Sequence, residues 1–391
     1  MFQHIKKLLL GNGLAQAIQL MSLLVLSRLY PPSDFGVLAQ IQAIATFSTI
    51  VATLQLHLAT PLSQSEDEAR TLTSHTQSIA LLFTLTLTIP ALLLGRIETY
   101  SLWLTLAIAL INTYNGHLIY RGNFSAISLF YVTRACLVVI AQVLFAFLEL
   151  QQALVLGTLI AETLAALYLM LVALDHRPML CSQPRLLLKT AMRHKAFSIH
   201  GTSQELVSVA AFYAPLVLFG IYFDAATAGQ YAMASRLVWA PTILVSKNIA
   251  QVLYHQHETL EARIKVKTGI QKRTVKLLAA LFLVNLAAFF LTDLFSALLG
   301  NQWETASRII PALTVWCSAF LLSTPFRVLC RSLKLQKFQL IIDLIFAFSI
   351  AACFMLTNFD PVTTTWILSS LGFIQNLAIA IVVRISANAT P

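Results

Sequence analysis

Three charged side chains lie near the middle of long apolar segments of this sequence. Arg134 falls within residues 124–148, Glu162 within 151–174 and Arg236 within 227–250. A charge near the centre of a membrane-spanning helix costs about 2.5 to 3.5 kcal/mol, so it rarely faces lipid and usually pairs or lines an aqueous path. At 1.5 Å per residue, Arg134 and Glu162 each lie about 15 Å along their segments. The sequence therefore favours an ion pair between these two residues, while Arg134 also stays a candidate for binding substrate in a cavity and Glu162 for ion coupling.

Arg236 has no acidic residue nearby on its own segment. A guanidinium stays charged and offers a planar fork of donors, which suits a phosphate or diphosphate group. The alternative is an ion pair with Glu205 on the segment 200–222, and the sequence favours neither reading. Glu205 lies with His200 near one end of that segment, where a carboxylate could also exchange a proton or an ion.

Two neighbouring segments carry polar side chains along one helical face. Spacings of three and four residues align Asn12, Gln16 and Gln19 on the first, and Gln42, Thr46, Thr49 and Thr53 on the second. These faces could hydrogen-bond between helices, at about 0.6 to 2 kcal/mol per contact, or line a water-filled cavity. Both readings stay open.

The composition requires that apolar helices position these residues. Of 391 residues, 58% are hydrophobic and only 11% charged, with a mean hydropathy of +0.77, whereas an ordinary soluble domain carries about 25% charge. A helix of about 20 apolar residues crosses a hydrocarbon core about 30 Å thick. We predict an all-α integral membrane protein with twelve spans, at residues 8–29, 36–59, 76–95, 100–120, 124–148, 151–174, 200–222, 227–250, 276–298, 306–328, 338–357 and 362–384.

The basic residues predict the orientation of these spans. With a cytoplasmic N-terminus, nearly all Lys and Arg fall in inner segments, and only Arg28, Arg96 and Arg308 fall in outer ones. Both termini are then cytoplasmic, and this asymmetry accounts for the net charge of +10 without a nucleic-acid partner.

The inner segment 175–199 divides the chain into six spans plus six. Arg185, Lys189 and Arg193 recur there every fourth residue beside Leu186, Leu187 and Met192, which predicts an amphipathic helix on an anionic membrane surface. We predict a first bundle at 1–174, this basic linker, and a second bundle at 200–391. The histidines of the other long inner loop and the scattered cysteines do not predict a metal site.

The two halves share a sequence pattern. The stretch "LVLSRLYPPSDFGVLA" from Leu24 aligns with "LVLFGIYFDAATAGQYA" from Leu216, so that Tyr30 matches Tyr222 and Gly36 matches Gly229 after one extra residue. Each stretch joins the first and second spans of its half, and we expect the glycine to admit the turn. Duplicated six-helix halves are typical of transporters with a substrate site between the halves.

These regions resemble a known family. "LVLSRLYPPSDFGVLAQIQAI" and "GIYFDAATAGQYAMASRLVWAPTILVSKNIAQVLYHQ" are similar to the two halves of bacterial polysaccharide transporters, the O-antigen type flippases of the multidrug/oligosaccharidyl-lipid/polysaccharide exporter (MOP) superfamily. The resemblance implies two six-helix bundles around a central cavity in the bacterial inner membrane. It also implies a substrate, an undecaprenyl-diphosphate-linked oligosaccharide, and cooperation with other polysaccharide assembly proteins.

Other function classes fit less well. The sequence has no GxxxxGK[ST], GxSxG or HExxH motif, so we expect neither an enzyme nor a cofactor. A cation-coupled multidrug exporter of the same superfamily stays open, and it should show acids rather than arginines in its cavity. A major-facilitator transporter would need a basic loop where "SQSEDEAR" is mostly acidic. An integral-membrane glycan polymerase is weakened by the few buried carboxylates.

Overall fold

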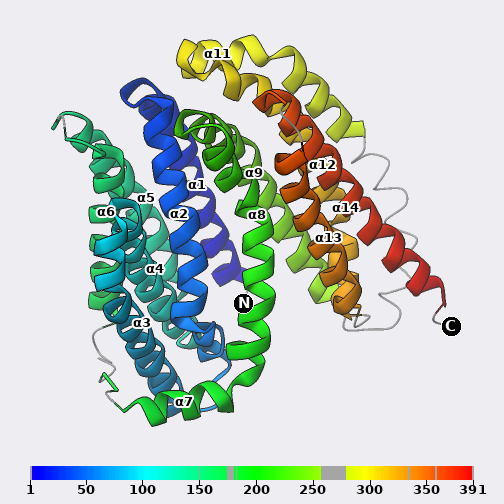
Figure 1. Ribbon diagram of the computed structural model, residues 1–391. Helices are drawn as coiled ribbons and strands as arrows, with labels where there is room; N and C mark the ends of the chain where they lie inside the picture. Colours follow the sequence, from blue (N-terminus) through cyan, green and yellow to red (C-terminus); the bar gives the residue numbers. More distant parts are fainter. Residues whose placement is uncertain are drawn as a thin grey trace. The chain divides into compact units, whose positions relative to one another are not determined.

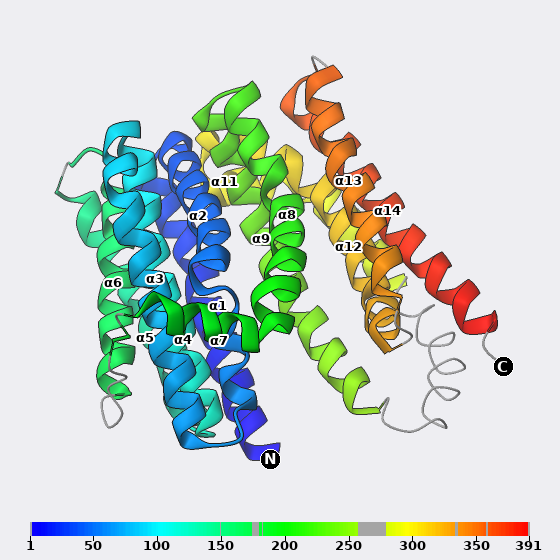
Figure 2. The same ribbon diagram turned by 60° about the horizontal axis from the view of Figure 1, so that its bottom comes forward.

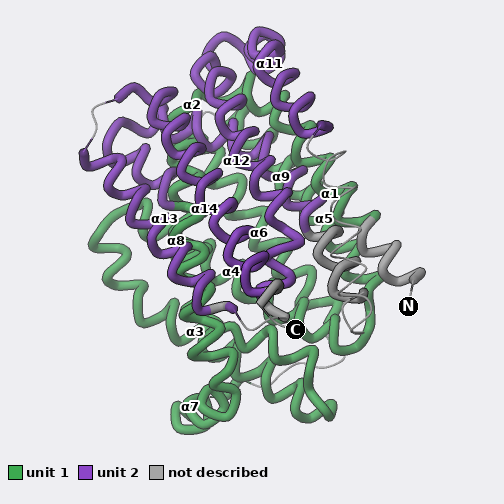
Figure 3. Tube along the Cα trace, turned by 90° about the vertical axis from the view of Figure 1, so that its right-hand side faces the viewer, with its two compact units in different colours: residues 1–213 green, residues 214–391 purple. Residues whose placement is uncertain are grey.

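The computed structural model describes residues 2–148, 150–173, 180–181, 183–256, 279–332, 335–356 and 359–389. This described part of the chain is helical and contains no strand. Its contacts divide the chain into two compact units, residues 1–213 and 214–391, which are coloured separately in Figure 3. The division falls inside a helix beyond the predicted linker 175–199. The prediction of an all-α membrane protein is confirmed.

Unit 1 contains helices α1 to α7, which are labelled in Figure 1. They are α1 Phe2–Leu29, α2 Pro32–Thr53, the short turns η1 Leu56–Leu58 and η2 Thr60–Leu62, α3 Glu66–Leu94, α4 Arg96–Tyr120, α5 Phe124–Ala146, α6 Ala153–Val172, α7 Pro184–Arg193 and the turn η4 Ala196–Gly201. Helix α8, Thr202–Tyr222, begins in unit 1 and ends in unit 2.

Unit 2 contains the remaining helices. They are α9 Ala225–Gln256, a helix at Ala279–Phe290, α11 Thr292–Leu299, the turn η5 Asn301–Trp303, α12 Glu304–Ser332, α13 Gln336–Leu356 and α14 Pro361–Ala389.

Ten helices of the described residues are long and apolar enough to cross a membrane. The pair Ala279–Phe290 and Thr292–Leu299, bent by 60°, makes an eleventh if it acts as one span. The predicted eighth span corresponds to α9, which is helical but is not among the ten, since Gln230 and Arg236 lower its hydropathy. Every predicted span therefore has a helix at its position, while the count of twelve stays a prediction.

Helix α4 is the centre of unit 1, because it packs against α2, α3, α5 and α6. Helix α1 packs against α5 on another side, where a Cβ at Gly11 would collide with Ser128. Near the other ends of both helices, the Tyr30 hydroxyl donates to the Gln142 carbonyl oxygen at 2.7 Å. Contacts that advance along both helices together show that α1 and α5 run in the same direction.

The helices of unit 2 pair in the same order. There α12, the fourth predicted span of its half as α4 is of the first, packs against α9, α11 and α14, and α13 packs against α14. Tyr222, the counterpart of Tyr30, lies 5.8 Å ring to ring from Phe354 on α13, as Tyr30 contacts α5. These matched contacts support an internal repeat, which stays a prediction.

The expected role of glycine at the repeated corner is wrong. Gly36 and Gly229 lie inside α2 and α9, where both are buried. The first turn is made at Pro31, whose extended backbone precedes α2. The second is made at Asp224, whose Oδ1 accepts from the Thr227 backbone N–H at 2.6 Å. Proline and a carboxylate cap therefore start these helices in place of the expected glycines.

Candidate functional site

Arg134 and Glu162 meet as predicted. Arg134 on α5 donates from Nε to Glu162 Oε2 on α6 at 2.7 Å and from Nη2 to Glu162 Oε1 at 2.8 Å. The side chain of Glu162 is 9% exposed and that of Arg134 is 27% exposed. This two-pronged geometry satisfies the buried carboxylate. Nη1 of Arg134 makes no hydrogen bond within the described ranges, so the paired guanidinium still offers donors to an anion.

Gln16 on α1 lies at nearly the same depth as this ion pair. Counted from the contact of Gly11 with Ser128, Gln16 is five residues along α1 and Arg134 six residues along α5, or about 8 and 9 Å at 1.5 Å per residue. Gln16 is partly buried, and its Oε1 is buried without a hydrogen-bond partner among the residues described. Unit 1 therefore has uncommitted polar groups near the middle of its helices.

The two predicted polar stripes contain partly buried or exposed residues at one end and a buried contact between helices at the other. Asn12 is partly buried and Gln19 is exposed on α1, while Gln42 and Thr46 are partly buried on α2. Farther along α2, Thr49 is buried and lies 3.4 Å from the Thr105 carbonyl oxygen of α4. That end of the stripe joins helices, as the interhelical reading expected. The end with Gln42 and Thr46 stays a cavity candidate.

The other predicted residues lie near the start of α8 and on α9. Arg236 is partly buried on α9, three residues before Trp239, whose ring packs edge to face with that of Trp316 at 5.3 Å. Glu205 on α8 and His200 in η4 are both exposed. Because Glu205 and Arg236 belong to different units, their pairing stays a prediction.

Unit 2 holds a polar network that the sequence reading missed. Arg327 on α12 donates to Asn376 Oδ1 on α14 at 3.0 Å, and Ser323 donates to the same oxygen at 2.6 Å. Next to Asn376, Gln375 donates to Asp343 Oδ1 on α13 at 2.7 Å. The amide pair Gln375–Asn376 within an apolar span was the available signal, since buried amides need partners.

Two boundary errors explain the omission. We expected Arg327 to be an inner-segment charge, but α12 continues to Ser332. Helix α13 begins at Gln336, two residues before the predicted span, which places Asp343 seven residues inside it, beyond its first turn. Both residues are therefore part of the helical packing of unit 2.

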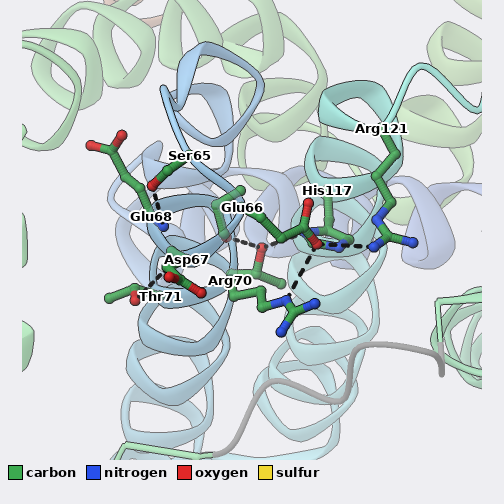
Figure 4. Close-up of polar contacts among 10 residues, drawn as sticks. Ser65, Glu66, Asp67, Glu68, Arg70, Thr71, His117 and Arg121 are labelled. Carbon is green, nitrogen blue, oxygen red and sulfur yellow. Dashed lines mark hydrogen bonds and ion pairs between the residues drawn. The ribbon is translucent and has the colours of Figure 1, made fainter.

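A second unpredicted polar cluster lies where η1 meets the ends of α3 and α4. Glu66, at the start of α3, accepts from Arg121 Nη2 at 2.9 Å and from Arg70 Nε at 3.3 Å (Figure 4). The Ser65 hydroxyl caps α3 by accepting from the Glu68 N–H. His117 Nδ1 lies 3.3 Å from the Thr73 hydroxyl. These contacts join the predicted cytoplasmic ends of α3 and α4.

The fold opposes protonation of His57 in η1. Its Nδ1 is buried without a hydrogen-bond partner in the described chain, and burial lowers the pKa of His57 to about 4. The backbone approach is close, because a Cβ at Gly116 would lie 2.5 Å from the His57 carbonyl oxygen. Neutral His57 is thus part of the packing between η1 and α4.

The chain matches a family and several solved structures. Residues 25–308 match the family described as "Polysaccharide biosynthesis protein". No curated protein matches the chain significantly. An inward-facing multidrug resistance MATE family transporter of the MOP superfamily is 13% identical with a TM-score of 0.71, over 97% of this chain and 95% of that one. The lipid II flippase MurJ in an inward closed conformation is 14% identical with a TM-score of 0.71, over 96% and 87%.

A third similar structure is a MOP superfamily transporter from Pyrococcus furiosus, described as having a binding pocket of reversed polarity. It is 14% identical with a TM-score of 0.59, over 99% of this chain and 96% of that one. At these identities the structural likeness shows the fold, and the family match covers most of the chain. This multi-pass membrane protein therefore belongs to the polysaccharide biosynthesis protein family and has the transporter fold of the MOP superfamily.

Proposed function

We propose that this protein is a flippase that moves an undecaprenyl-diphosphate-linked oligosaccharide from the cytoplasmic to the outer leaflet of a bacterial inner membrane by alternating access. The observation that carries the proposal is the family match over residues 25–308. The fold likeness to the lipid II flippase supports it, because that protein is named for translocating a lipid-linked substrate.

The charged residues fit an anionic cargo. Arg134 is held by Glu162 through Nε and Nη2, so its Nη1 donors are positioned by that pair and can bind a diphosphate oxygen. Arg236 is the second candidate for that group, since a guanidinium binds phosphate with paired donors. Asn12, Gln16, Gln19, Gln42 and Thr46 are uncharged donors and acceptors suited to sugar hydroxyls.

The second candidate is a cation-coupled multidrug exporter. The MATE likeness favours it as strongly as the flippase likeness by TM-score. A cationic drug needs a buried acid that is not neutralised, yet Glu162 is paired with Arg134. Glu205 and His200 stay candidates for coupling to a proton or ion in either case. An integral-membrane glycan polymerase is a weaker alternative.

Deletion of the gene in its host, followed by mass spectrometry of extracted polyprenyl-linked glycans, tests the proposal. We expect a complete oligosaccharide to accumulate on its diphosphate carrier while the surface polysaccharide is lost, and the wild-type gene to reverse both changes. Unchanged carrier-linked glycans with intact surface polysaccharide would contradict the flippase, and a gain in drug sensitivity in the same strain would favour the exporter.

A further inference from the structure

Helix α7 and Cys181, which precedes it, are held against α3 by three polar contacts. The Thr190 hydroxyl lies 2.6 Å from His75 Nδ1, the Cys181 N–H donates to the Ser78 hydroxyl at 2.9 Å, and Arg193 lies 3.8 Å from the Glu68 carboxylate. Figures 1 and 2 show α7 lying crosswise to α3 within unit 1. These contacts define the position of α7 relative to the first half of α3.

The apolar residues of α7 do not all face the same way. Leu187 and Ala191 are 7% and 8% exposed, so they face the bundle, whereas Leu188 and Met192 are 65% and 56% exposed. This corrects the sequence reading, which placed Leu187 on the membrane face. At about 100° per residue, Leu188 and Met192 form one flank of α7, and the exposed Arg185 and Lys189 lie between that flank and the outward side.

The contacts with α3 show which flank points toward the bilayer. Arg193, on the flank opposite Leu188, reaches Glu68 near the start of α3. Thr190 contacts His75, which is seven residues deeper in α3. Around the circumference of α7, Arg193 is followed by Thr190, then by the buried Leu187 and then by Leu188. The first two contacts show that this order moves away from the start of α3. Leu188 therefore faces the apolar part of α3.

The composition of α3 places α7 at the membrane surface. From Ser65 to Ser78 the helix and its cap are mostly polar, while from Ile79 to Leu94 it is apolar and largely exposed from Leu82 onward. The 20 residues from His75 to Leu94 rise about 28 Å along the helix axis, close to the hydrocarbon thickness of about 30 Å. The His75–Thr190 contact thus lies at the level of the lipid headgroups.

We propose that α7 is an interfacial helix that inserts Leu188 and Met192 among the acyl chains and binds anionic phospholipid headgroups with Arg185 and Lys189. Basic side chains beside an inserted apolar flank are complementary to a phosphate layer above hydrocarbon. The lipid would secure the segment that connects the two six-span halves to the surface of the inner leaflet. This inference does not depend on which substrate the protein moves.

Two variants of α7 test its depth. Leu188→Trp and Leu186→Trp add the same fluorophore on opposite flanks, since Leu186 lies beside Arg193 and is 42% exposed. In vesicles of dibrominated phosphatidylcholine, we expect the added emission of Leu188→Trp to be quenched and that of Leu186→Trp to be retained. Each full-length variant is first checked for an unchanged elution volume by size exclusion. Equal quenching at both positions, or none at residue 188, would show that α7 does not insert this flank and would overturn the proposal.

A second experiment tests the headgroup contact. Phosphatidylglycerol is titrated into the detergent-solubilised full chain, and its apparent affinity is measured from the rise in melting temperature. Removing each basic contact should weaken that affinity about fivefold, so Arg185→Gln combined with Lys189→Gln should weaken it about 25-fold. Arg185→Lys combined with Lys189→Arg should retain it.

The matched charge control is Arg96→Gln combined with Arg308→Gln, two exposed residues on the predicted outer side. We expect this control to keep the wild-type affinity. An equal loss in both neutralised double variants would indicate a general charge effect, and no loss in the α7 variant would place the lipid site elsewhere. Either outcome would overturn the headgroup assignment.

Discussion

At the scale of single residues, the Arg134–Glu162 pair makes a prediction about stability. Breaking a buried ion pair by removing one partner leaves an uncompensated charge and costs about 3 to 5 kcal/mol, whereas replacing both partners by apolar residues is often nearly neutral. We expect Arg134→Leu and Glu162→Leu each to lower the melting temperature and the monodisperse yield, and the double variant to recover much of both. Equal losses in all three variants would contradict the pair's coupling.

Arg236 makes a prediction about transport. If it binds a diphosphate, Arg236→Lys should keep partial flipping activity, because an ammonium still attracts phosphate but loses the paired donors. Arg236→Gln should lose activity while membrane levels stay normal. Complementation of the deletion strain, with quantification of surface polysaccharide and of the protein by immunoblot, measures both. Full activity of Arg236→Gln would exclude a role in binding the cargo.

His57 makes a prediction about pH. Its pKa is lowered to about 4 in the folded chain from about 6.5 when unfolded, so the unfolded state binds the proton first. Stability should therefore be complete above about pH 6.5 and decline as the pH falls toward 4, by at most roughly 3 kcal/mol. Melting curves between pH 7.5 and 4.5 measure this decline. His57→Gln should make the decline shallower, and an identical pH dependence in this variant would show that other groups cause it.

At the scale of helices and turns, Gly116 allows η1 to approach α4. A Cβ there would lie 2.5 Å from the His57 carbonyl oxygen, so Gly116→Ala should shift η1 and destabilise the protein by about 1 to 3 kcal/mol. Gly13 on α1 is the control, because a Cβ there meets nothing within 4 Å. Gly13→Ala should be neutral or stabilising. Thermal melts of both variants measure these effects on stability. Equal melting temperatures would contradict the close approach of η1 to α4.

The sequence predicted the elements well wherever hydropathy alone defined them. Arg134 and Glu162 were identifiable because each is a lone charge at similar depth in adjacent spans. The start of α3 was placed ten residues late, since the Thr, Ser, His and Gln residues between Leu72 and Ile79 depress hydropathy although they are buried. The ends of α12 and α13 near Arg327 and Asp343 were predicted too short, since the basic residues between them lower the hydropathy. The hydrogen-bond partners of such buried polar residues depend on tertiary contacts, which helical periodicity in the sequence does not predict.

At the scale of the whole molecule, the number of spans decides the side on which the C-terminus lies. Helix α9 has 32 residues, or about 48 Å at 1.5 Å per residue, so it is long enough to cross the bilayer despite Arg236. If α9 did not cross, the basic residues between Arg263 and Lys276 would lie outside, against the asymmetry that the other inner segments obey. The charge pattern therefore predicts that α9 spans the membrane and that both termini are cytoplasmic.

Reporter fusions test this topology. A C-terminal green fluorescent protein fusion should fluoresce and a C-terminal alkaline phosphatase fusion should be inactive, because the first reporter folds in the cytoplasm and the second needs the periplasm to form its disulfides. A phosphatase fusion after Asn301, on the predicted outer side, is the positive control. The reverse result at the C-terminus would mean an odd number of spans. The predicted repeat of six spans plus six would then fail.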